Sequence, residues 1–467
     1  MRVRRTLALA AAAVTTMALA GCLGQQQESD TGRNADAKDV TLTVTANAVA
    51  GGKNDITATW ITDWVIPEFT KQQKAKGVNV TVKFDGTGVD DADYKAKIAL
   101  DFGTDIGGDV VEVDGIWLGE FAQGGQIQPL DDVVGKDKVD AWDGWSQITD
   151  AVQAVGEYEG KRYGIPVGTD GRVIFFNKKL FAQVGLPADW QPTSWEEITA
   201  AAVSLKQLPG VIPVQLNAGT AMTEATTMQG VLPLLAGTGA EVHQDGKWQG
   251  ATENVKQVLD LYKQVYAGKL GDPVLAQEAK GRDRSFELFA QNKIGMLLES
   301  DYFWRSVVDP TVGVAKMADR DTAVGWAKIP AMNPGSGVGG QDFVSMSGGS
   351  VRVINPNTKY PQQAWELLQF MNSAAATKAR LGDTAQVTQR DDVNEEVLEN
   401  DPMLRFIAEE VLPITRFRPG LAEYPKVSTA LQQATADIVA GKSVDEAASA
   451  YEEALVKAVG EDKVARG

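Results

Sequence analysis

Acidic side chains next to tryptophan are the feature of this sequence with the clearest chemical use. Trp117 follows Asp114 in VEVDGIW, and Trp304 follows Glu299 and Asp301 in LLESDYFW. A sugar presents an apolar C–H face and a rim of hydroxyl groups, so an aromatic ring beside carboxylates suits it. Burial in a hydrophobic core is the alternative for any single Trp. The pattern therefore favours a binding site for a polyol over a site for covalent chemistry.

Catalysis has little support in the composition of the chain. The 467 residues include one Cys and one His, and His243 lies in the polar stretch GAEVHQDGKW. A zinc site needs three or four N, S or O ligands, and a Ser-His-Asp triad would have to use this single imidazole. We expect no catalytic residue, no metal and no cofactor. A secreted glycan-cleaving enzyme that uses two carboxylates stays open as an alternative.

The charge of the chain argues against nucleic acid as a partner. Lys and Arg number 45 and Asp and Glu number 62, which gives a formal net charge of −17. Such a field repels phosphate backbones. The alternative is that the acidity serves only solubility.

The first residues have the features of an export signal. Three arginines precede an apolar run from Leu7 to Leu19, which is too short for a permanent membrane span. The run ends in LAGC, which resembles the lipobox of a bacterial lipoprotein and puts the only Cys of the chain, Cys22, at the lipidated position. We expect residues 1–21 to be a signal peptide, residues 22–39 to be a flexible tether, and two acyl chains to hold the protein on a membrane surface.

The body of the chain alternates strand and helix patterns from Val40 onwards. VNVTVKF alternates apolar and polar residues as a half-buried strand does, and DVVEV is a short apolar run typical of a buried parallel strand. SWEE at 194–197 predicts a capped helix start. Strands separated by helices predict an α/β fold with parallel sheets. Helical stripes are expected at 198–205, 255–262 and 364–371.

Five segments in the same order resemble the family 1 extracellular solute-binding proteins of bacterial ABC importers, of which maltose-binding protein is typical. They begin with YKAKIALDFGTDIGGDVVEVDGIWLGEFAQGGQIQPLDD. YGIPVGTDGRVIFFNKKLFAQVGL with PTSWEEI resembles the first crossing between lobes, and FELFAQNKIGMLLESDYFW resembles a segment ending at a ligand-facing aromatic. GVGGQDFVSMSGG and PQQAWELLQFMNS resemble the second crossing and its helix.

The resemblance implies a two-lobe, class II periplasmic-binding-protein-like α/β fold, with a hinge and a cleft between the lobes. The crossings are expected near Pro166 and Gly340. A ligand in the cleft would contact both lobes and stabilise the closed form. Lobe 1 would hold residues 40–165 and 342–400, and lobe 2 would hold residues 168–340 and 401–467.

The resemblance also implies the residues that bind substrate. At SDYFW the sequence departs from the family's Gly-Trp, so Tyr302, Phe303 and Trp304 all stay candidates for the aromatic that faces ligand. Arg418 could donate a planar fork to vicinal hydroxyls, or it could form an ion pair between the lobes or at the surface. The expected substrate-binding residues are Asp114, Trp117, Asp170, Asn217, Glu224, Asp301, Trp304, Gln341, Asp342 and Arg418.

The function that follows is capture of a sugar or oligosaccharide outside the cytoplasm by a monomeric, lipid-anchored protein. The captured sugar would pass to the permease subunits of an ABC transporter. An alternative keeps this fold but gives the cleft a cationic solute, such as a polyamine or a quaternary amine, because acids with Trp also form cages for cations.

Overall fold

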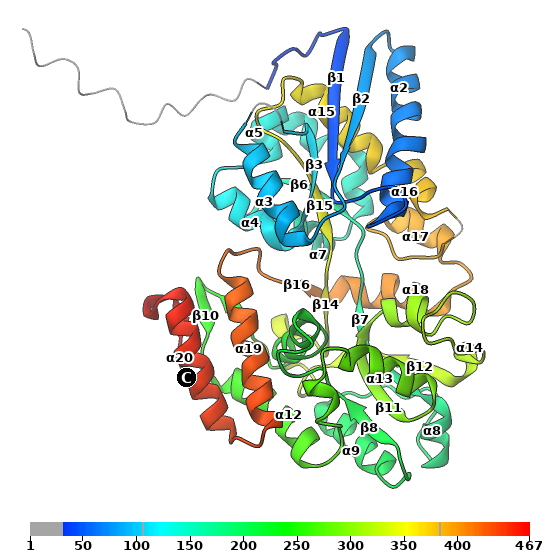
Figure 1. The fold of residues 1–467 in the computed structure, drawn as a ribbon, viewed down its shortest axis with the longest axis vertical. Coiled ribbons are helices and arrows are strands. Elements are labelled where there is room, and N and C mark those ends of the chain that lie inside the picture. The colour runs from blue at the N-terminus through cyan, green and yellow to red at the C-terminus, as the bar shows by residue number, and fades with distance from the viewer. Residues whose placement is uncertain (1–30, 105–106, 383) are drawn as a thin grey trace, which may run out of the picture.

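Two lobes make up the molecule, one above the other in Figure 1, and the chain passes between them more than once. The computed structural model describes residues 31–104, 107–382 and 384–467. The expected signal peptide, Cys22 and the first part of the expected tether lie outside these ranges. Within them, no helix is both long and apolar enough to cross a membrane.

Lobe 1, the upper lobe, is built on a five-stranded sheet in the order β2-β1-β3-β15-β6. β1 and β2 run parallel in register from Asp39↔Asn79 to Ala46↔Gly86, and β1 and β3 are also parallel. The side chains of β1 alternate, with Val40, Leu42 and Val44 buried. The strands are β1 (Asp39–Ala46), β2 (Asn79–Gly86), β3 (Val110–Asp114), β15 (Ser350–Ile354) and β6 (Gly164–Val167).

Helices cover the lobe 1 sheet, and the first of them after β2 is α3 (Asp91–Phe102). The predicted stripe at 364–371 is correct, because Ala364, Leu367, Leu368 and Met371 are on the buried side of α15 (Pro361–Met371). The other helices of this lobe include α2 (Ile66–Ala75), α4 (Leu118–Gln123), α7 (Asp150–Gln153), α16 (Ala374–Leu381) and α17 (Asp391–Val397).

The end of the expected tether packs against lobe 1 instead of standing free of it. The Asn34 side chain donates to the Lys359 carbonyl at 2.9 Å, and Gln363 donates to the Asn34 carbonyl at 3.0 Å. Gln362 reaches the Thr31 carbonyl at 2.6 Å. The folded part therefore begins before the predicted Val40. The polar composition of this stretch gives no sign of the contact, because the side chains of α15 bind mainly the backbone carbonyl groups of the stretch.

Lobe 2 is built on a four-stranded sheet in the order β12-β7-β11-β8. β7 is buried throughout, with Val173 and Phe175 in one hydrophobic cluster and Ile174 and Phe176 in another, so both faces of this sheet are covered. The strands are β7 (Arg172–Asn177), β8 (Ile212–Gln215), β11 (Ile294–Ser300) and β12 (Val324–Ala327).

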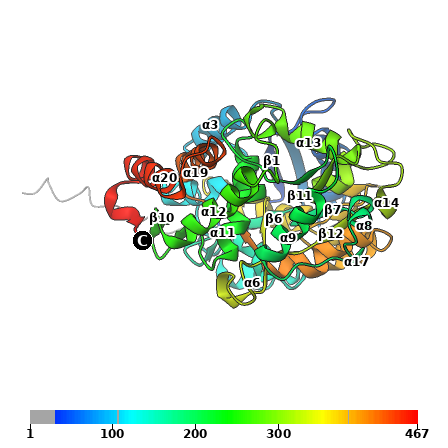
Figure 2. The same cartoon turned by 90° about the horizontal axis from the view of Figure 1, so that it is seen from below.

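The predicted helix start at 194–197 is present, with one difference. The Ser194 hydroxyl accepts from the Glu197 N–H at 3.3 Å, but the Glu197 carboxylate accepts from the Thr193 N–H at 2.7 Å and not from Ser194. The helix, α9 (Trp195–Leu205), and α12 (Glu253–Ala267) bury the predicted stripes. Figure 2 shows α19 (Tyr424–Val439) and α20 (Val444–Val459) together at one side of the molecule, near α12.

The chain crosses between lobes from β6 to β7 and again from β14 (Phe343–Ser347) to β15. The second crossing lies at Gly348 and Gly349, later in the chain than the predicted Gly340. The reason is that β14 pairs with β13 (Ile329–Pro330) and β16 (Thr415–Phe417) before the chain enters lobe 1. A further passage leads from α17 to α18 (Pro402–Phe406).

Candidate functional site

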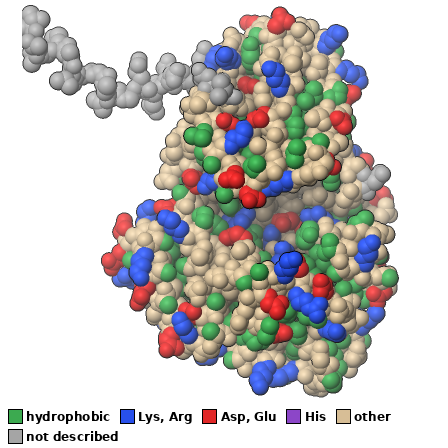
Figure 3. Space-filling model, in the orientation of Figure 1, with side chains coloured by type: hydrophobic (Ala, Val, Ile, Leu, Met, Phe, Trp, Pro, Cys, Tyr) green, Lys and Arg blue, Asp and Glu red, His purple; other side chains and the backbone are tan. Residues whose placement is uncertain are grey.

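A groove of about 560 Å³ opens on lobe 2, and Figure 3 shows the surface hollowed between the two lobes. Its walls come from the start of β7, from α10 (Glu224–Thr226), from α13 (Gly281–Ala290) and from the segment after β16. Polar side chains dominate this lining, and they include Arg172, Glu224, Gln229, Arg282 and Arg418.

Three predicted residues follow strand ends, as residues at the edge of a parallel sheet do. Asp114 ends β3, Asn217 comes shortly after β8, and Asp301 comes directly after β11. Each takes part in the charge network beside the groove, although through different contacts.

Arg172 is buried at the base of the groove and organises the first crossing. Its Nε donates to Gln229 Oε1 at 2.9 Å, its Nη1 donates to the Met346 carbonyl at 3.2 Å, and it forms an ion pair with Asp170. Asp170 also accepts from the Gly348 N–H at 2.7 Å. Burial alone would raise the pKa of the Asp170 carboxyl, but Arg172 and this N–H together hold it below its ordinary value. The predicted Asp170 therefore ties the two crossings together.

Glu299 forms a second buried ion pair, with Arg282. The Arg282 fork donates to the two carboxylate oxygens at 2.8 and 2.7 Å, and Asn217 Nδ2 donates to the same carboxylate at 3.0 Å. Burial would lower the pKa of Arg282, but these contacts with Glu299 raise it. The predicted Asn217 thus acts through Glu299, which fixes the guanidinium that lines the groove.

Arg418 lies between the lobes and meets a carboxylate of each. Its Nη1 is 3.3 Å from Glu224 Oε2 in lobe 2, and its Nη2 is 3.8 Å from Asp114 Oδ1 in lobe 1. Glu224 also accepts from the Tyr424 hydroxyl at 3.0 Å and from Ser428. Burial raises the pKa of Asp114, while Arg418 opposes that effect. The structure thus brings Asp114, Glu224 and Arg418 together.

Asp301 is fully buried beneath the groove. Its carboxylate accepts from the Gly171 N–H at 3.1 Å and pairs with Arg305 Nε at 3.0 Å. Burial raises the pKa of this carboxyl despite the partner Arg305. These contacts make Asp301 a support for the first crossing in this structure.

Both predicted tryptophans lie in hydrophobic cores. Trp117 is 9% exposed and packs against Tyr94, with the ring centroids 6.3 Å apart. Trp304 is 2% exposed, and its indole N–H donates to Asp401 Oδ2 at 3.0 Å. The Arg320 guanidinium covers the Trp304 ring at 3.9 Å from its centroid. Neither ring presents a free face to the groove.

Tyr302 is the exposed aromatic among the three candidates at SDYFW. Its exposed fraction is 37%, whereas Phe303 is fully buried. The guanidinium groups of Arg305 and Arg282 lie 5.6 and 6.0 Å from its ring centroid, so it stands beside the groove wall. The alternation of a strand cannot predict that Tyr302 is the exposed one, because β11 has ended before this residue and the chain continues as a π-helix (Phe303–Val307).

Gln341 and Asp342 lie away from this cluster. They precede β14, whose other end, Ser347, donates to the Asp170 carbonyl at the crossing. At about 3.3 Å per residue, Asp342 is roughly 17 Å along the strand from that end. Asp342 is exposed, and its carbonyl accepts from the Ala331 N–H at 2.8 Å.

Each arginine at the groove has a carboxylate partner within the protein, and Lys280 and Asp283 line the groove beside these pairs. Such a surface offers directed N–H donors and carboxylate acceptors. Among the described ranges, no group of His, Cys, Asp or Glu is placed to hold a metal ion. The pairs are Arg172–Asp170, Arg282–Glu299, Arg305–Asp301 and Arg418–Glu224.

Sequence reasoning did not include several groove residues among its predicted binding residues. Arg172 could have been found, because it follows Asp170 at the predicted crossing. Arg282 and Gln229 carry no such signal, since they reach the groove only through the packing of α13 and of the π-helix after α10 (Thr227–Val231) on the lobe 2 sheet.

Two α/β lobes, with a polar groove on lobe 2 and a hollow between the lobes, are the features of a solute-binding protein. The chain belongs to the family described as bacterial extracellular solute-binding protein, whose pattern matches residues 29–378. This confirms the predicted family and the two-lobe fold. The family binds solutes and is not enzymatic, so the glycan-cleaving alternative is wrong.

Similar proteins of known sequence or structure cover nearly the whole chain. A putative binding protein of Brucella abortus (strain 2308) is 23% identical over 433 residues, which is 91% of this chain and 95% of the relative. The cyclic α-maltosyl-1,6-maltose binding protein of Arthrobacter globiformis is 20% identical with a TM-score of 0.68, covering 90% of this chain and 99% of that one. The GacH receptor of Streptomyces glaucescens GLA.O, solved with acarbose, is 22% identical with a TM-score of 0.64, covering 91% and 99%.

Proposed function

We propose that this protein captures an uncharged sugar or oligosaccharide in the groove between its lobes and delivers it to the permease of an ABC importer. The observation that carries the proposal is the composition of the groove. An exposed tyrosine, Tyr302, stands beside paired arginines and carboxylates. Such a set offers an aromatic face for stacking and directed polar atoms for the hydroxyl groups of a polyol.

Solved relatives support the ligand class. Their structures were determined with acarbose, with maltotetraose and with ribitol, all of which carry many hydroxyl groups. The cationic alternative has less support, because Arg172, Arg282 and Arg418 already occupy three carboxylates at the groove. Asp283 is a further carboxylate in the lining, at the exposed edge of α13. Sugar binding would favour the closed arrangement of the lobes by contacting both.

We also propose an anchor and a division into lobes. Lipidation of Cys22 after removal of residues 1–21 would hold the mature, monomeric protein at the outer side of the cell membrane. Lobe 1 would comprise the chain up to the first crossing and the stretch from β15 to about residue 400. β14 goes with lobe 2, because it pairs with β13 and β16.

A thermal-shift panel tests the ligand. The Cys22→Ser chain is melted with neutral oligosaccharides, polyols, polyamines and quaternary amines, each at low and high salt. A solute at a hundred times its Kd stabilises the folded state by about 2.7 kcal/mol. We expect a shift with a neutral saccharide that salt leaves unchanged. A shift produced by a polyamine and abolished by salt, or no shift with any saccharide, would contradict the proposal.

Metabolic labelling tests the anchor. Cells expressing the parent chain should incorporate an alkyne-tagged fatty acid into this protein and retain it in the membrane fraction. The Cys22→Ser chain should incorporate none. Equal labelling of the two chains would exclude Cys22 as the modified residue.

A further inference from the structure

A segment of lobe 2, residues 417–421, reaches up to lobe 1 and returns; we call it the strap. Its start is anchored in lobe 2, where Phe417 at the end of β16 pairs with Ser347 of β14. Its end leads into α19, which packs on α12 and α20. Figure 1 shows the chain rising towards the upper lobe between β16 and α19.

Two glycines let the strap touch lobe 1 backbone to backbone. A Cβ added to Gly119, inside α4, would lie 1.9 Å from the Gly420 carbonyl oxygen. A Cβ added to Gly420 would lie 3.2 Å from the Gly119 nitrogen and 3.3 Å from the Gly115 oxygen. Neither glycine has a positive φ, so backbone conformation does not require glycine at either position. Close approach between the lobes is the physical reason for it.

Side chains of the strap also engage lobe 1. Phe417 packs against the hydrophobic cluster of lobe 1 that includes Tyr94 and Trp117. Arg418, with only 14% of its side chain exposed, stands between Asp114 of lobe 1 and Glu224 of lobe 2. Arg418, which lines the groove, thus belongs to a strap that contacts lobe 1.

The strap also contacts its own lobe. Leu421 packs against the hydrophobic cluster of lobe 2, and Phe417 is paired with Ser347 of β14. Beside these contacts, Phe417 and Pro419 border a cavity of about 100 Å³ with lobe 2 residues that include Leu232, Ala236 and Met346. The strap therefore joins the two lobes, and its closest backbone approach to lobe 1 is at Gly119 and Gly420.

We propose that Gly119 and Gly420 are positioning residues for the groove. Their contact holds the strap on lobe 1, places Arg418 between the two carboxylates and sets the spacing of the lobes in the protein without solute. The inference deepens the proposed function, because Arg418 lines the same groove, but the spacing itself requires no sugar.

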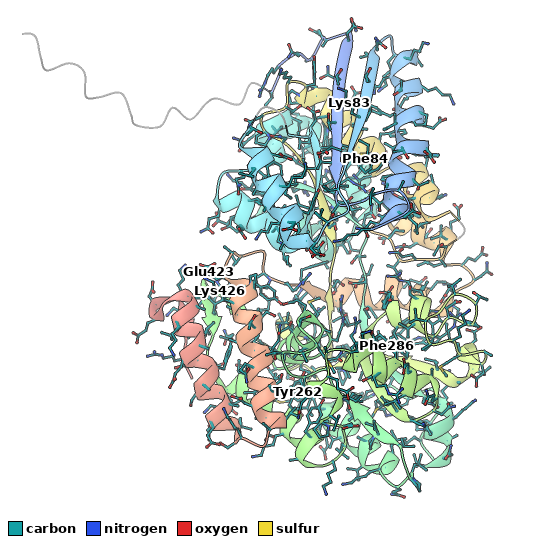
Figure 4. The ribbon with its side chains drawn as sticks, in the orientation of Figure 1. Lys83, Phe84, Tyr262, Phe286, Glu423 and Lys426 are labelled. Carbon is teal, nitrogen blue, oxygen red and sulfur yellow. The ribbon has the colours of Figure 1, made fainter. Side chains whose placement is uncertain are left out.

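The spacing can be measured with spin labels, because Cys22 is the only cysteine. The Cys22→Ser chain receives cysteines in place of Lys83 on β2 and Lys263 on α12, both exposed. Figure 4 marks Lys83 in the upper lobe and Tyr262, the neighbour of Lys263, in the lower lobe. Double electron–electron resonance then gives the distribution of distances between the lobes, recorded without any solute.

Gly119→Ala is the main variant, since its Cβ demands movement of the strap or of α4. In Gly420→Ala the added Cβ is less close to the opposite lobe, so this variant replaces Gly119→Ala if that chain does not fold. Gly124→Ala is the matched control, because Gly124 ends the same helix and its Cβ would meet only residues of lobe 1. Thermal melting of each variant reports stability separately.

We expect the main distance peak of the parent to shift or broaden in Gly119→Ala, to change less in Gly420→Ala and to stay unchanged in Gly124→Ala. A purely structural role would lower the melting temperature and leave the distances as they are. Folded Gly119→Ala and Gly420→Ala chains with the parent distribution would overturn the inference. Because no solute is present, either result is independent of whether the groove binds a sugar.

Discussion

Replacing Tyr302 tests how the groove holds its solute. Large aromatic side chains bury roughly 200 Å², and Tyr302 is 37% exposed, which leaves roughly 75 Å² for a ligand to cover. At about 25 cal/mol per Å², full coverage contributes about 1.9 kcal/mol. The Tyr302→Ala variant should therefore bind up to roughly 20-fold more weakly.

Isothermal titration calorimetry with the saccharide that gives the largest thermal shift is the assay. The Tyr302→Phe variant is the control, because it keeps the ring and should keep most of the affinity. Melting of the two variants without solute should match the parent, since the ring is outside the core. An unchanged affinity for Tyr302→Ala would refute the assignment of this ring to the ligand.

Three further predictions follow from buried groups. Glu299→Ala leaves Arg282 and Asn217 without their partner and should lower the free energy of unfolding, measured by urea titration, by about 3–5 kcal/mol. Glu299→Gln should lower it by about half as much. Equal losses in the two variants would contradict the ion-pair argument. Trp304→Ala should lose about 3–5 kcal/mol as a core truncation, and an unchanged melting temperature would show that the ring is not core. Burial raises the pKa of Asp114, so the folded protein takes up this proton before the unfolded chain as pH falls. Protonation of Asp114 does not itself destabilise the fold, but it removes the negative charge that faces Arg418. The distances between the lobes should therefore change as the pH falls, at a pH above the ordinary aspartate pKa of about 3.9. In the Asp114→Asn variant, the distances should not change in this pH range.

Local patterns in the sequence were sufficient for the elements. The period of two along residues 78–84 and the stripe at 364–371 follow from which side chains must be buried, and these are properties of neighbours in the chain. The order of strands and helices, together with five family-like segments, was sufficient for the two-lobe fold.

The predicted strand ends also brought Asp114, Asn217 and Asp301 to one region, because the ends of the strands meet there. Their individual roles could not be read in advance. Asn217 and Asp301 are occupied by Glu299, Arg305 and the Gly171 N–H.

Only the tertiary structure decided which aromatic side chain is exposed beside the groove. Trp304 and Tyr302 are two residues apart, yet Arg320 and Asp401 bury the first and leave the second exposed. Exposure depends on partners from distant parts of the chain, and no local spacing encodes it. The same holds for Gly119 and Gly420, which look like ordinary glycines until the fold places one against the other.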